Sequence, residues 1–303
     1  MTYSFQSLKP QSDRIAVVTG ANVGLGYETA KALASKDLTV VLACRNLDKA
    51  NKAIERIKKS YPAAKLDALA LDLCSNQSIR SFASAYNSKY KSLDLLINNA
   101  GVMMPPYQQT EDGLESQMAA NYFGHFLLTS LLLPILESTP GARIVALSSL
   151  AHAWGDIDFE DINSEKHYNA RKVYGQSKLA CLMFAYELSR QFKERNYQVS
   201  SIAAHPGVTI TEIGRNIHPL LVGLGHLVSP FIFQKPHEGA WPILRAALDP
   251  KAKNGDYFGP GGFRQYKGPA VKVGSDRNSR NEEKANRLWK LTEELMGINF
   301  FPT

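Results

Sequence analysis

Short apolar runs alternate with longer amphipathic stretches along most of this 303-residue chain, and this alternation constrains the fold more than any other feature. The short runs are rich in β-branched residues, which favour strands, and the longer stretches repeat their apolar positions at helical spacing. Such alternation is typical of a parallel sheet with helices on both faces. We therefore predict an α/β fold built on a doubly wound parallel sheet of about seven strands.

The elements can be placed to within a few residues. The expected strands lie at residues 14–19, 39–43, 66–71, 93–97, 142–147, 198–204 and 256–258. The expected helices lie at residues 24–35, 47–60, 76–89, 113–136, 172–194, 237–248 and 279–296. Ligands of such folds bind outside the carboxyl ends of the strands, where the strand order reverses, so the functional site is expected at that edge.

The chain shows no linker, repeat or low-complexity block that would divide it. We predict one domain over residues 1–303, with residues 1–12 as an N-terminal extension. The polar N-terminus lacks the apolar stretch of a signal peptide or membrane span, and Cys44, Cys74 and Cys181 lie far apart. These features predict a cytoplasmic protein with no transmembrane segment.

The distribution of charge argues against a nucleic-acid-binding site, and the placement of the histidines argues against a metal site. The net charge of +7 is spread among nearly as many acids, so no nucleic-acid partner is expected. His152 and His167 occupy a loop without a His, Asp or Glu cluster at metal-binding spacing, so no metal is assigned.

A glycine-rich turn follows the first expected strand. Ile15–Thr19 ends at Gly20, and Gly24 and Gly26 open an apolar-periodic stretch. Glycines at such a turn let backbone approach a pyrophosphate at a helix N-terminus. The spacing differs from the commoner Gly-x-Gly-x-x-Gly fingerprint, and a purely structural turn is the alternative.

Tyr174 and Lys178 stand one helical turn apart in a predicted helix and so share a face. A neighbouring ammonium favours the phenolate and moves the pKa of a tyrosine toward neutrality, where proton exchange with a carbonyl or alcohol oxygen is efficient. An ordinary surface pair is the alternative, and only the accompanying motifs favour catalysis.

In order and spacing, these motifs resemble those of the short-chain dehydrogenase/reductase superfamily. They are Thr19-Gly20-Ala21-Asn22-Val23-Gly24-Leu25-Gly26, Asp72, Asn98-Asn99-Ala100-Gly101, Asn121, Ser149, Tyr174, Lys178 and Pro206-Gly207. Further stretches resemble the retinol-dehydrogenase-like branch: Leu42-Ala43-Cys44-Arg45, Ser78-Ile79-Arg80-Ser81-Phe82, Gly124-His125-Phe126-Leu127-Leu128-Thr129 and Ser148-Ser149-Leu150-Ala151-His152. The resemblance covers roughly residues 13 to 260, thins beyond 209, and implies a Rossmann-type fold.

The resemblance implies a nicotinamide dinucleotide cofactor and assigns its contacts. These are Gly20, Asn22, Gly24, Leu25, Gly26, Arg45, Asp72, Leu73, Asn99, Ala100, Gly101, Tyr174, Lys178, Pro206, Gly207, Val208 and Thr209. Asp72 would meet the adenine amino group, although it could instead cap the helix beginning near Asn76. Asn98 would brace the central strand.

The residue at the end of the second strand predicts which cofactor is used. An acid there would accept hydrogen bonds from a ribose 2′-hydroxyl, whereas an arginine can pair with a 2′-phosphate. Arg45 follows Ala43-Cys44 with no acid between them, so NADP(H) is expected in preference to NAD(H).

By the same resemblance, four residues form the catalytic set. Ser149 would hydrogen-bond the reacting oxygen, and Tyr174 would exchange a proton with it. Lys178 would assist Tyr174 and hold the nicotinamide ribose, and Asn121 would anchor a water in the proton relay. Each has an ordinary structural alternative; for Asn121 it is a satisfied core amide.

The apolar segment 217–233 lies within a region, residues 209–240, that we interpret as a substrate lid. A lid of this kind would favour an apolar carbonyl or alcohol substrate. A subunit interface in a homo-oligomer and a contact with a membrane surface are the alternatives.

The resulting functional hypothesis is an NADP(H)-dependent oxidoreductase that interconverts a carbonyl compound and an alcohol. A protochlorophyllide-reductase-like enzyme is a second hypothesis, since that family also carries Tyr-x-x-x-Lys. A dinucleotide-sensing or scaffold protein without turnover is a third.

Overall fold

Buried β-branched and leucine-rich segments form one eight-stranded sheet in the computed structural model, which describes residues 5–209 and 233–301. The strands are β1 (Ile15–Thr19), β2 (Thr39–Cys44), β3 (Leu66–Ala70), β4 (Leu95–Asn98), β5 (Arg143–Leu147), β6 (Ser200–Ala204), β7 (Tyr257–Pro260) and β8 (Ala270–Lys272). Their spatial order is β3-β2-β1-β4-β5-β6-β7-β8. Strands β1 to β7 are parallel and β8 is antiparallel to β7, so the predicted doubly wound α/β fold is confirmed.

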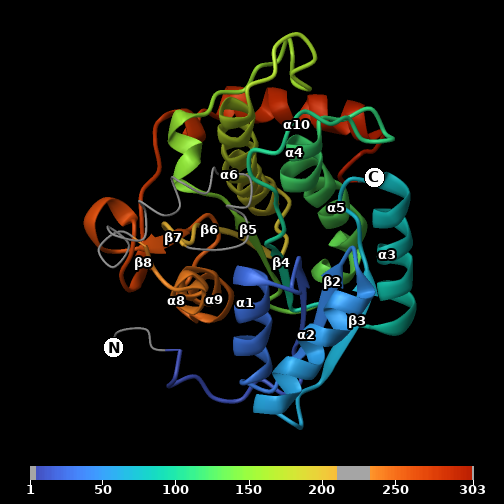
Figure 1. Cartoon of the computed structure of the whole chain (residues 1–303), viewed down its shortest axis with the longest axis vertical. Coiled ribbons are helices and arrows are strands. Elements are labelled where there is room, and N and C mark those ends of the chain that lie inside the picture. The colour runs from blue at the N-terminus through green and yellow to red at the C-terminus, as the bar shows by residue number, and fades with distance from the viewer. Residues whose placement is uncertain (1–4, 210–232, 302–303) are drawn as a thin grey trace.

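Helices cover both faces of this sheet (Figure 1). The longer ones are α1 (Gly24–Ala34), α2 (Leu47–Ser60), α3 (Asn76–Lys89), α5 (Gly124–Glu137), α6 (Ala170–Glu194), α9 (Trp241–Leu248) and α10 (Glu282–Met296). The short ones are α4 (Ser116–Met118), α8 (Pro236–Gly239), the π turn η1 (Ala119–Phe123) and the 3₁₀ turns η2 (Leu150–Trp154), η4 (Phe263–Gln265) and η5 (Asn278–Arg280).

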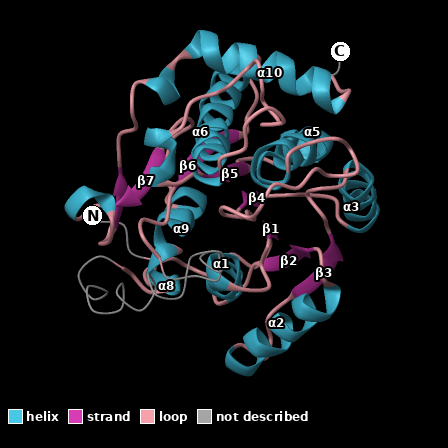
Figure 2. Cartoon of the chain, turned by 45° about the horizontal axis from the view of Figure 1, so that its top comes forward, coloured by secondary structure: helices cyan, strands magenta, loops and turns pink. Residues whose placement is uncertain are grey.

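Side chains alternate between the two faces of the sheet along each strand, so the core has two layers. Figure 2 shows the helices that cover the two faces. Val17 and Val41 pack with buried residues of α3, α5 and α6 on one face. Val18 and Leu42 pack with buried residues of α1, α2 and α9 on the other. Because both faces are covered, the central strands read as continuous apolar runs.

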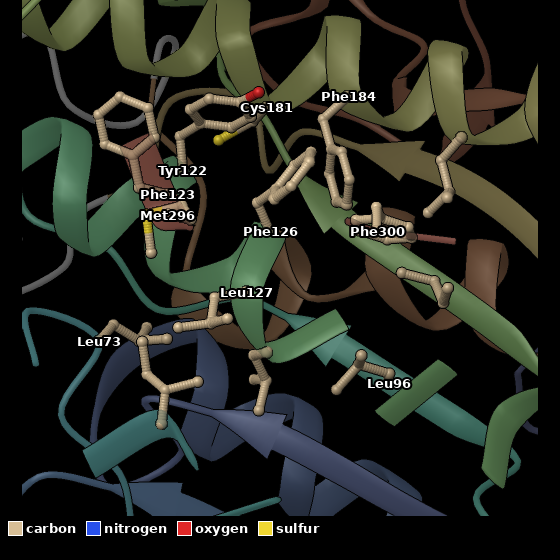
Figure 3. Packing of buried hydrophobic residues seen from close by; sticks show 14 of the residues in the cluster. Leu73, Leu96, Tyr122, Phe123, Phe126, Leu127, Cys181, Phe184, Met296 and Phe300 are labelled. Atoms are coloured by element: carbon tan, nitrogen blue, oxygen red, sulfur yellow. The ribbon is translucent and has the colours of Figure 1, made fainter. Parts of the chain in front are cut away.

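The C-terminal helix and the residues after it complete the α5–α6 layer. The Phe300 ring lies 4.8 Å from that of Phe126 and 4.6 Å from that of Trp289, measured between centroids. Figure 3 shows Phe126, Phe184 and Phe300 converging between the helices. Trp289 of α10 and Phe300 therefore pack against α5 and α6, and α6 is the helix that carries Tyr174 and Lys178.

Several predicted boundaries were wrong, each for a local reason. The sheet has β8 as an additional strand, preceded by Gly268 and Pro269. The helix expected at 237–248 is two helices divided at Ala240, since Pro242 lacks an N–H and is tolerated only in a first turn. The helix expected at 279–296 begins at Glu282, where the Asn281 side chain caps it by accepting a hydrogen bond from Lys284 N.

The helix expected at 113–136 spans Ser116–Glu137 and contains the π turn η1. Within the described ranges, this stretch alone is long and apolar enough to cross a membrane. Its apolar window is 78% buried inside the protein, which makes it a core helix of the sheet's covering layer.

Candidate functional site

A cavity of about 250 Å³ opens at the carboxyl ends of β1, β2, β3 and β4, where the strand order reverses. Most of the expected cofactor residues line it: Gly20, Asn22, Gly24, Leu25, Gly26, Arg45, Asp72, Leu73, Asn99, Ala100 and Gly101. The sequence reasoning missed other lining residues: Val23, Ala43, Cys44, Leu71, Cys74, Val102 and Ala120. Most of these residues are adjacent in sequence to a motif residue, and this adjacency could have predicted that they line the cavity.

The glycine turn between β1 and α1 places the N-terminus of α1 at one end of this cavity. Gly24 adopts a φ of +58°, which side-chain-bearing residues rarely take. A Cβ on Gly26 would lie 2.4 Å from Gly20 O, so α1 can approach the turn only with glycine there. The N-terminus of α1 has no side-chain cap and no acid in its first turn, so it suits an anion such as a pyrophosphate.

Thr19 and Asn99 tie β1 to the loop after β4 across the floor of the cavity. Thr19 Oγ1 accepts hydrogen bonds from the backbone N–H groups of Asn99 and Ala100, each at 2.9 Å. Asn99 Nδ2 donates to Thr19 O at 2.8 Å. Asn99 Oδ1 is buried and accepts no hydrogen bond from the described residues, so an acceptor remains for a ligand in the cavity.

Arg45, after β2, and Asp72, after β3, face each other in the lining of the cavity. Their nearest charged atoms, Nη1 and Oδ2, are 4.0 Å apart, and the Arg45 side chain is 78% exposed. Asp72 Oδ1 accepts from Cys74 N, while Ser75 caps α3 by accepting from Ser78 N. The alternative in which Asp72 caps that helix was therefore wrong.

Two cysteines beside Arg45 and Asp72 are poorly suited to nucleophilic chemistry. Burial raises the pKa of Cys44 to about 11 and, reinforced by the charge of Asp72, that of Cys74 also to about 11. Both are therefore neutral lining groups at physiological pH.

The helix α6 carries both Tyr174 and Lys178. Asn169 begins the helix by accepting from the backbone N–H groups of Arg171 and Lys172. Both Tyr174 and Lys178 are buried.

Lys178 Nζ is held at the rim of the cavity. It donates to Leu147 O at the end of β5 over 3.1 Å. A Cβ on Gly101 would lie 3.4 Å from the same Nζ, so the ammonium sits against a residue that lines the cavity.

Asn121 lies in the π turn, and its side chain is satisfied within the protein. Its Oδ1 accepts from Val102 N at 2.8 Å, and its Nδ2 donates to Val102 O and Ser177 Oγ. The amide thereby fixes the loop after Gly101 against α6. The role of anchoring a water stays a prediction.

His125 joins the π turn to the glycine turn, a link that sequence reasoning missed. Since Asn121 O only accepts, His125 Nδ1 donates to it, and His125 Nε2 then accepts from Thr19 Oγ1; both distances are 2.9 Å. Burial lowers the pKa of His125 to about 4, which keeps the ring neutral.

Ser149 ends the extended segment after β5 and caps the turn η2. Its Oγ accepts from Ala151 N at 3.2 Å. The far end of η2 packs tightly on α6, because a Cβ on Gly155 would lie 2.3 Å from the backbone of Gly175. The turn η2, which begins after Ser149, therefore packs against α6, the helix that carries Tyr174.

Pro206, Gly207, Val208 and Thr209 follow β6 and do not line the cavity. Gly207 has a φ of +67°. Thr209 Oγ1 donates to Pro206 O, and Thr209 forms an isolated bridge with Gln234. Within the expected lid at residues 209–240, residues 210–232 lie outside the described residues, and residues 233–240 contain α8.

Asn98 braces β4 against α5 as expected, since its Nδ2 donates to Thr129 Oγ1 at 3.0 Å. No group of three or more His, Cys, Asp or Glu side chains able to hold a metal occurs within residues 5–209 and 233–301.

Known proteins resemble this chain in sequence over nearly its whole length. The family model described as "short chain dehydrogenase" matches residues 14–220. Retinol dehydrogenase 12 of Mus musculus is 40% identical over 95% of this chain and 87% of its own length. Retinol dehydrogenase 13 of Mus musculus is 40% identical over 94% and 84%. Polyprenol dehydrogenase of Homo sapiens is 36% identical over 95% and 87%.

Solved structures agree with these sequence relationships. A crystal structure of an uncharacterized protein from Mycobacterium paratuberculosis matches with a TM-score of 0.82 and 33% identity, covering 100% of both chains. Salutaridine reductase from Papaver somniferum shares the fold at 23% identity and a TM-score of 0.63, over 80% of this chain and 99% of that one. The chain is an oxidoreductase of the short-chain dehydrogenase/reductase superfamily and belongs to its retinol-dehydrogenase-like branch.

Proposed function

We propose that this protein is an NADP(H)-dependent oxidoreductase that interconverts an apolar carbonyl compound and its alcohol. The observation that carries the proposal is the position of Lys178 Nζ, which lies against Gly101 at the rim of the dinucleotide cavity. Lys178, one of the proposed proton-transfer residues, therefore lies beside the proposed cofactor site, and a hydride transfer coupled to proton transfer requires such proximity.

The cavity fits a nicotinamide dinucleotide. The uncapped N-terminus of α1 can receive the pyrophosphate, and Asn99 Oδ1 supplies an unused acceptor. When bound, the nicotinamide ring supplies or accepts the hydride. Arg45 supports NADP(H) over NAD(H), because its exposed guanidinium borders the cavity with no acid at the end of β2.

The chain's own residues then manage the proton and the charge on the reacting oxygen. Tyr174 donates its phenolic proton to that oxygen during reduction and takes it back during oxidation. The Lys178 ammonium stabilises the phenolate, and Ser149 Oγ donates a hydrogen bond to the oxygen as negative charge develops. Asn121 holds the loop after Gly101 against α6, and its anchoring of a water that replaces the proton is the role that the resemblance implies.

An apolar substrate is supported by the names of the relatives, which act on retinol and polyprenol, and by the apolar segment within the proposed lid at residues 209–240. We propose that the protein is a single domain that works in the cytoplasm. The alternative proposal for the apolar segment 217–233 is that it forms a subunit interface in a homo-oligomer.

Oxidation of NADPH, followed in light and in darkness across aldehydes, ketones and quinones, tests the proposal. We expect turnover that is independent of light and increases with the apolar chain length of the carbonyl compound. Turnover only under illumination would favour the protochlorophyllide-reductase-like alternative. Tight NADPH binding with no turnover on any of these compounds would favour a sensing role and would refute the enzyme proposal.

A further inference from the structure

The backbone carbonyl of Ser149 is held by a histidine that the proposed chemistry does not use. His152 Nδ1 donates to Ser149 O at 2.6 Å, and the His152 backbone N–H donates to the same oxygen at 3.1 Å. Because a carbonyl oxygen can only accept, Nδ1 must carry a proton. The imidazole of His152 is therefore hydrogen-bonded to the backbone of Ser149, the residue whose hydroxyl is proposed to contact the reacting oxygen.

The other ring nitrogen of His152 faces an acid from the C-terminal part of the chain. Nε2 lies 3.2 Å from Asp276 Oδ2, and the His152 side chain is only 6% exposed. Oδ2 is buried and accepts no hydrogen bond among the described residues, whereas Oδ1 accepts from Ser279 N. A buried carboxylate oxygen without hydrogen bonds is costly unless a positive charge lies beside it.

These contacts place the His152 ring between the serine turn and the C-terminal part of the chain. Its Nδ1 edge donates to Ser149 O, and its Nε2 edge faces Asp276 Oδ2. The neighbouring His205 differs, because its Nδ1 accepts from Gly207 N, and burial lowers its pKa to about 4. Of these two histidines, His152 is the one whose ring contacts Ser149.

The segment around Asp276 braces the serine turn at a second point. Asn278 Nδ2 donates to Gly155 O at 3.3 Å and to Asp156 Oδ1 at 3.1 Å. Lys284 of α10 forms an ion pair with the same Asp156 at 2.5 Å. Residues beyond the 14–220 match to the family model thus contact the middle of η2 at His152 and the residues that follow it at Gly155 and Asp156.

We infer that His152 and Asp276 are a positioning pair that fixes the backbone of Ser149, and with it the direction of its hydroxyl, for the proposed reaction. The inference rests on the proposed function for its effect on turnover. The mechanical link from Asp276 through His152 to Ser149 does not, so the two can be tested separately.

Three variants separate the contacts. His152→Asn places an amide N–H where Nδ1 stands and keeps the hydrogen bond to Ser149 O, but it loses the contact with Asp276 Oδ2. His152→Leu loses both contacts, and Asp276→Asn removes only the charge while leaving an oxygen for Ser279 N. His167→Asn, at an exposed loop histidine, is the matched control.

Turnover is measured as kcat and KM for an aldehyde that the wild type reduces, and NADPH affinity by fluorescence titration. We expect kcat to fall roughly ten- to hundredfold in His152→Leu, because small misplacements of a reacting group cost this much. His152→Asn should recover part of the loss, and NADPH affinity should stay within about twofold. Equal kcat in wild type and His152→Leu would overturn the inference, as would parallel losses of turnover, NADPH affinity and thermal stability in all three variants.

Hydrogen–deuterium exchange over residues 149–155 gives a readout that needs no turnover. The amides of His152 and Gly155 are hydrogen-bonded in this turn, and we expect faster exchange in His152→Leu and Asp276→Asn than in wild type or His167→Asn. Unchanged exchange in Asp276→Asn overturns the inference even if the enzyme is active. If wild type reduces no carbonyl compound, the proposed function fails, and exchange alone decides the positioning link.

Discussion

Substituting Gly155 by alanine should increase the separation between η2, which follows Ser149, and α6, which carries Tyr174. The added Cβ would lie 2.3 Å from both C and O of Gly175 and 2.8 Å from Gln176 N, all of them backbone atoms of α6. Carbon atoms in ordinary contact are about 3.5–4.0 Å apart, so the two segments must move apart by about 1 Å. The φ of Gly155 is −89°, which alanine adopts freely, so the effect is steric.

This displacement predicts different losses of stability and activity. Overpacking of this kind costs about 1–3 kcal/mol of the free energy of unfolding. A shift of about 1 Å between groups that act on one oxygen can lower the catalytic efficiency by about a hundredfold. The assay compares kcat/KM for NADPH-dependent aldehyde reduction with unfolding by urea in the same protein.

Gly141→Ala supplies the control for that comparison. Gly141 has a φ of +72° and no atom within 4 Å of an added Cβ, and it precedes β5 at the edge of the sheet opposite the cavity. Alanine there should cost about 1–2 kcal/mol through backbone strain and leave kcat/KM unchanged. The steric reasoning is refuted if Gly155→Ala keeps wild-type kcat/KM, or if Gly141→Ala loses as much activity.

Three further outcomes follow from the site. Tyr174→Phe should lower kcat by about a hundredfold or more, as expected for loss of a general acid, with NADPH affinity nearly retained; near-normal turnover in stopped-flow assays would contradict its role. Arg45→Asp should weaken NADPH binding by about 10- to 100-fold and shrink or invert the preference over NADH, and equal affinities of the wild type for the two cofactors would remove the basis for this expectation. Folding lowers the pKa of His125 to about 4, so the imidazole is unprotonated at neutral pH. As the pH falls, the histidine of the unfolded chain takes up a proton before that of the folded protein does. The protein should therefore lose about 3 kcal/mol of stability between about pH 6.5 and pH 4 through this group, and urea titrations of His125→Gln should show a shallower pH dependence; identical slopes would show that His125 does not contribute.

The positions of the central strands and most of the cofactor cavity were predictable because they depend on local signals. The β-branched run before Gly20 and the glycine spacing after it each determine their own element within a few residues. The helices α2 and α3 were predicted with the bounds that the structure shows, since polar caps at Asn46 and Ser75 mark their beginnings.

The errors arose where tertiary packing decides local structure. The π turn at Ala119–Phe123 contains no proline or glycine, and its hydrogen bonds run to His125 and Cys181, which no local pattern reveals. The three-residue strand β8 gains its pairing only from β7. Asp276 and His152 lie far apart in the chain, so neither residue alone indicated that they meet behind Ser149.

The most direct test of the account follows the hydride itself. NADPH deuterated at the transferring face of the nicotinamide C4 is incubated with the wild type and a long-chain aldehyde, and the alcohol is examined by mass spectrometry and NMR. The account predicts deuterium on the carbinol carbon of the product for the wild type and the same product at a strongly reduced rate for Tyr174→Phe. Alcohol without deuterium, or equal rates for the two proteins, would contradict it.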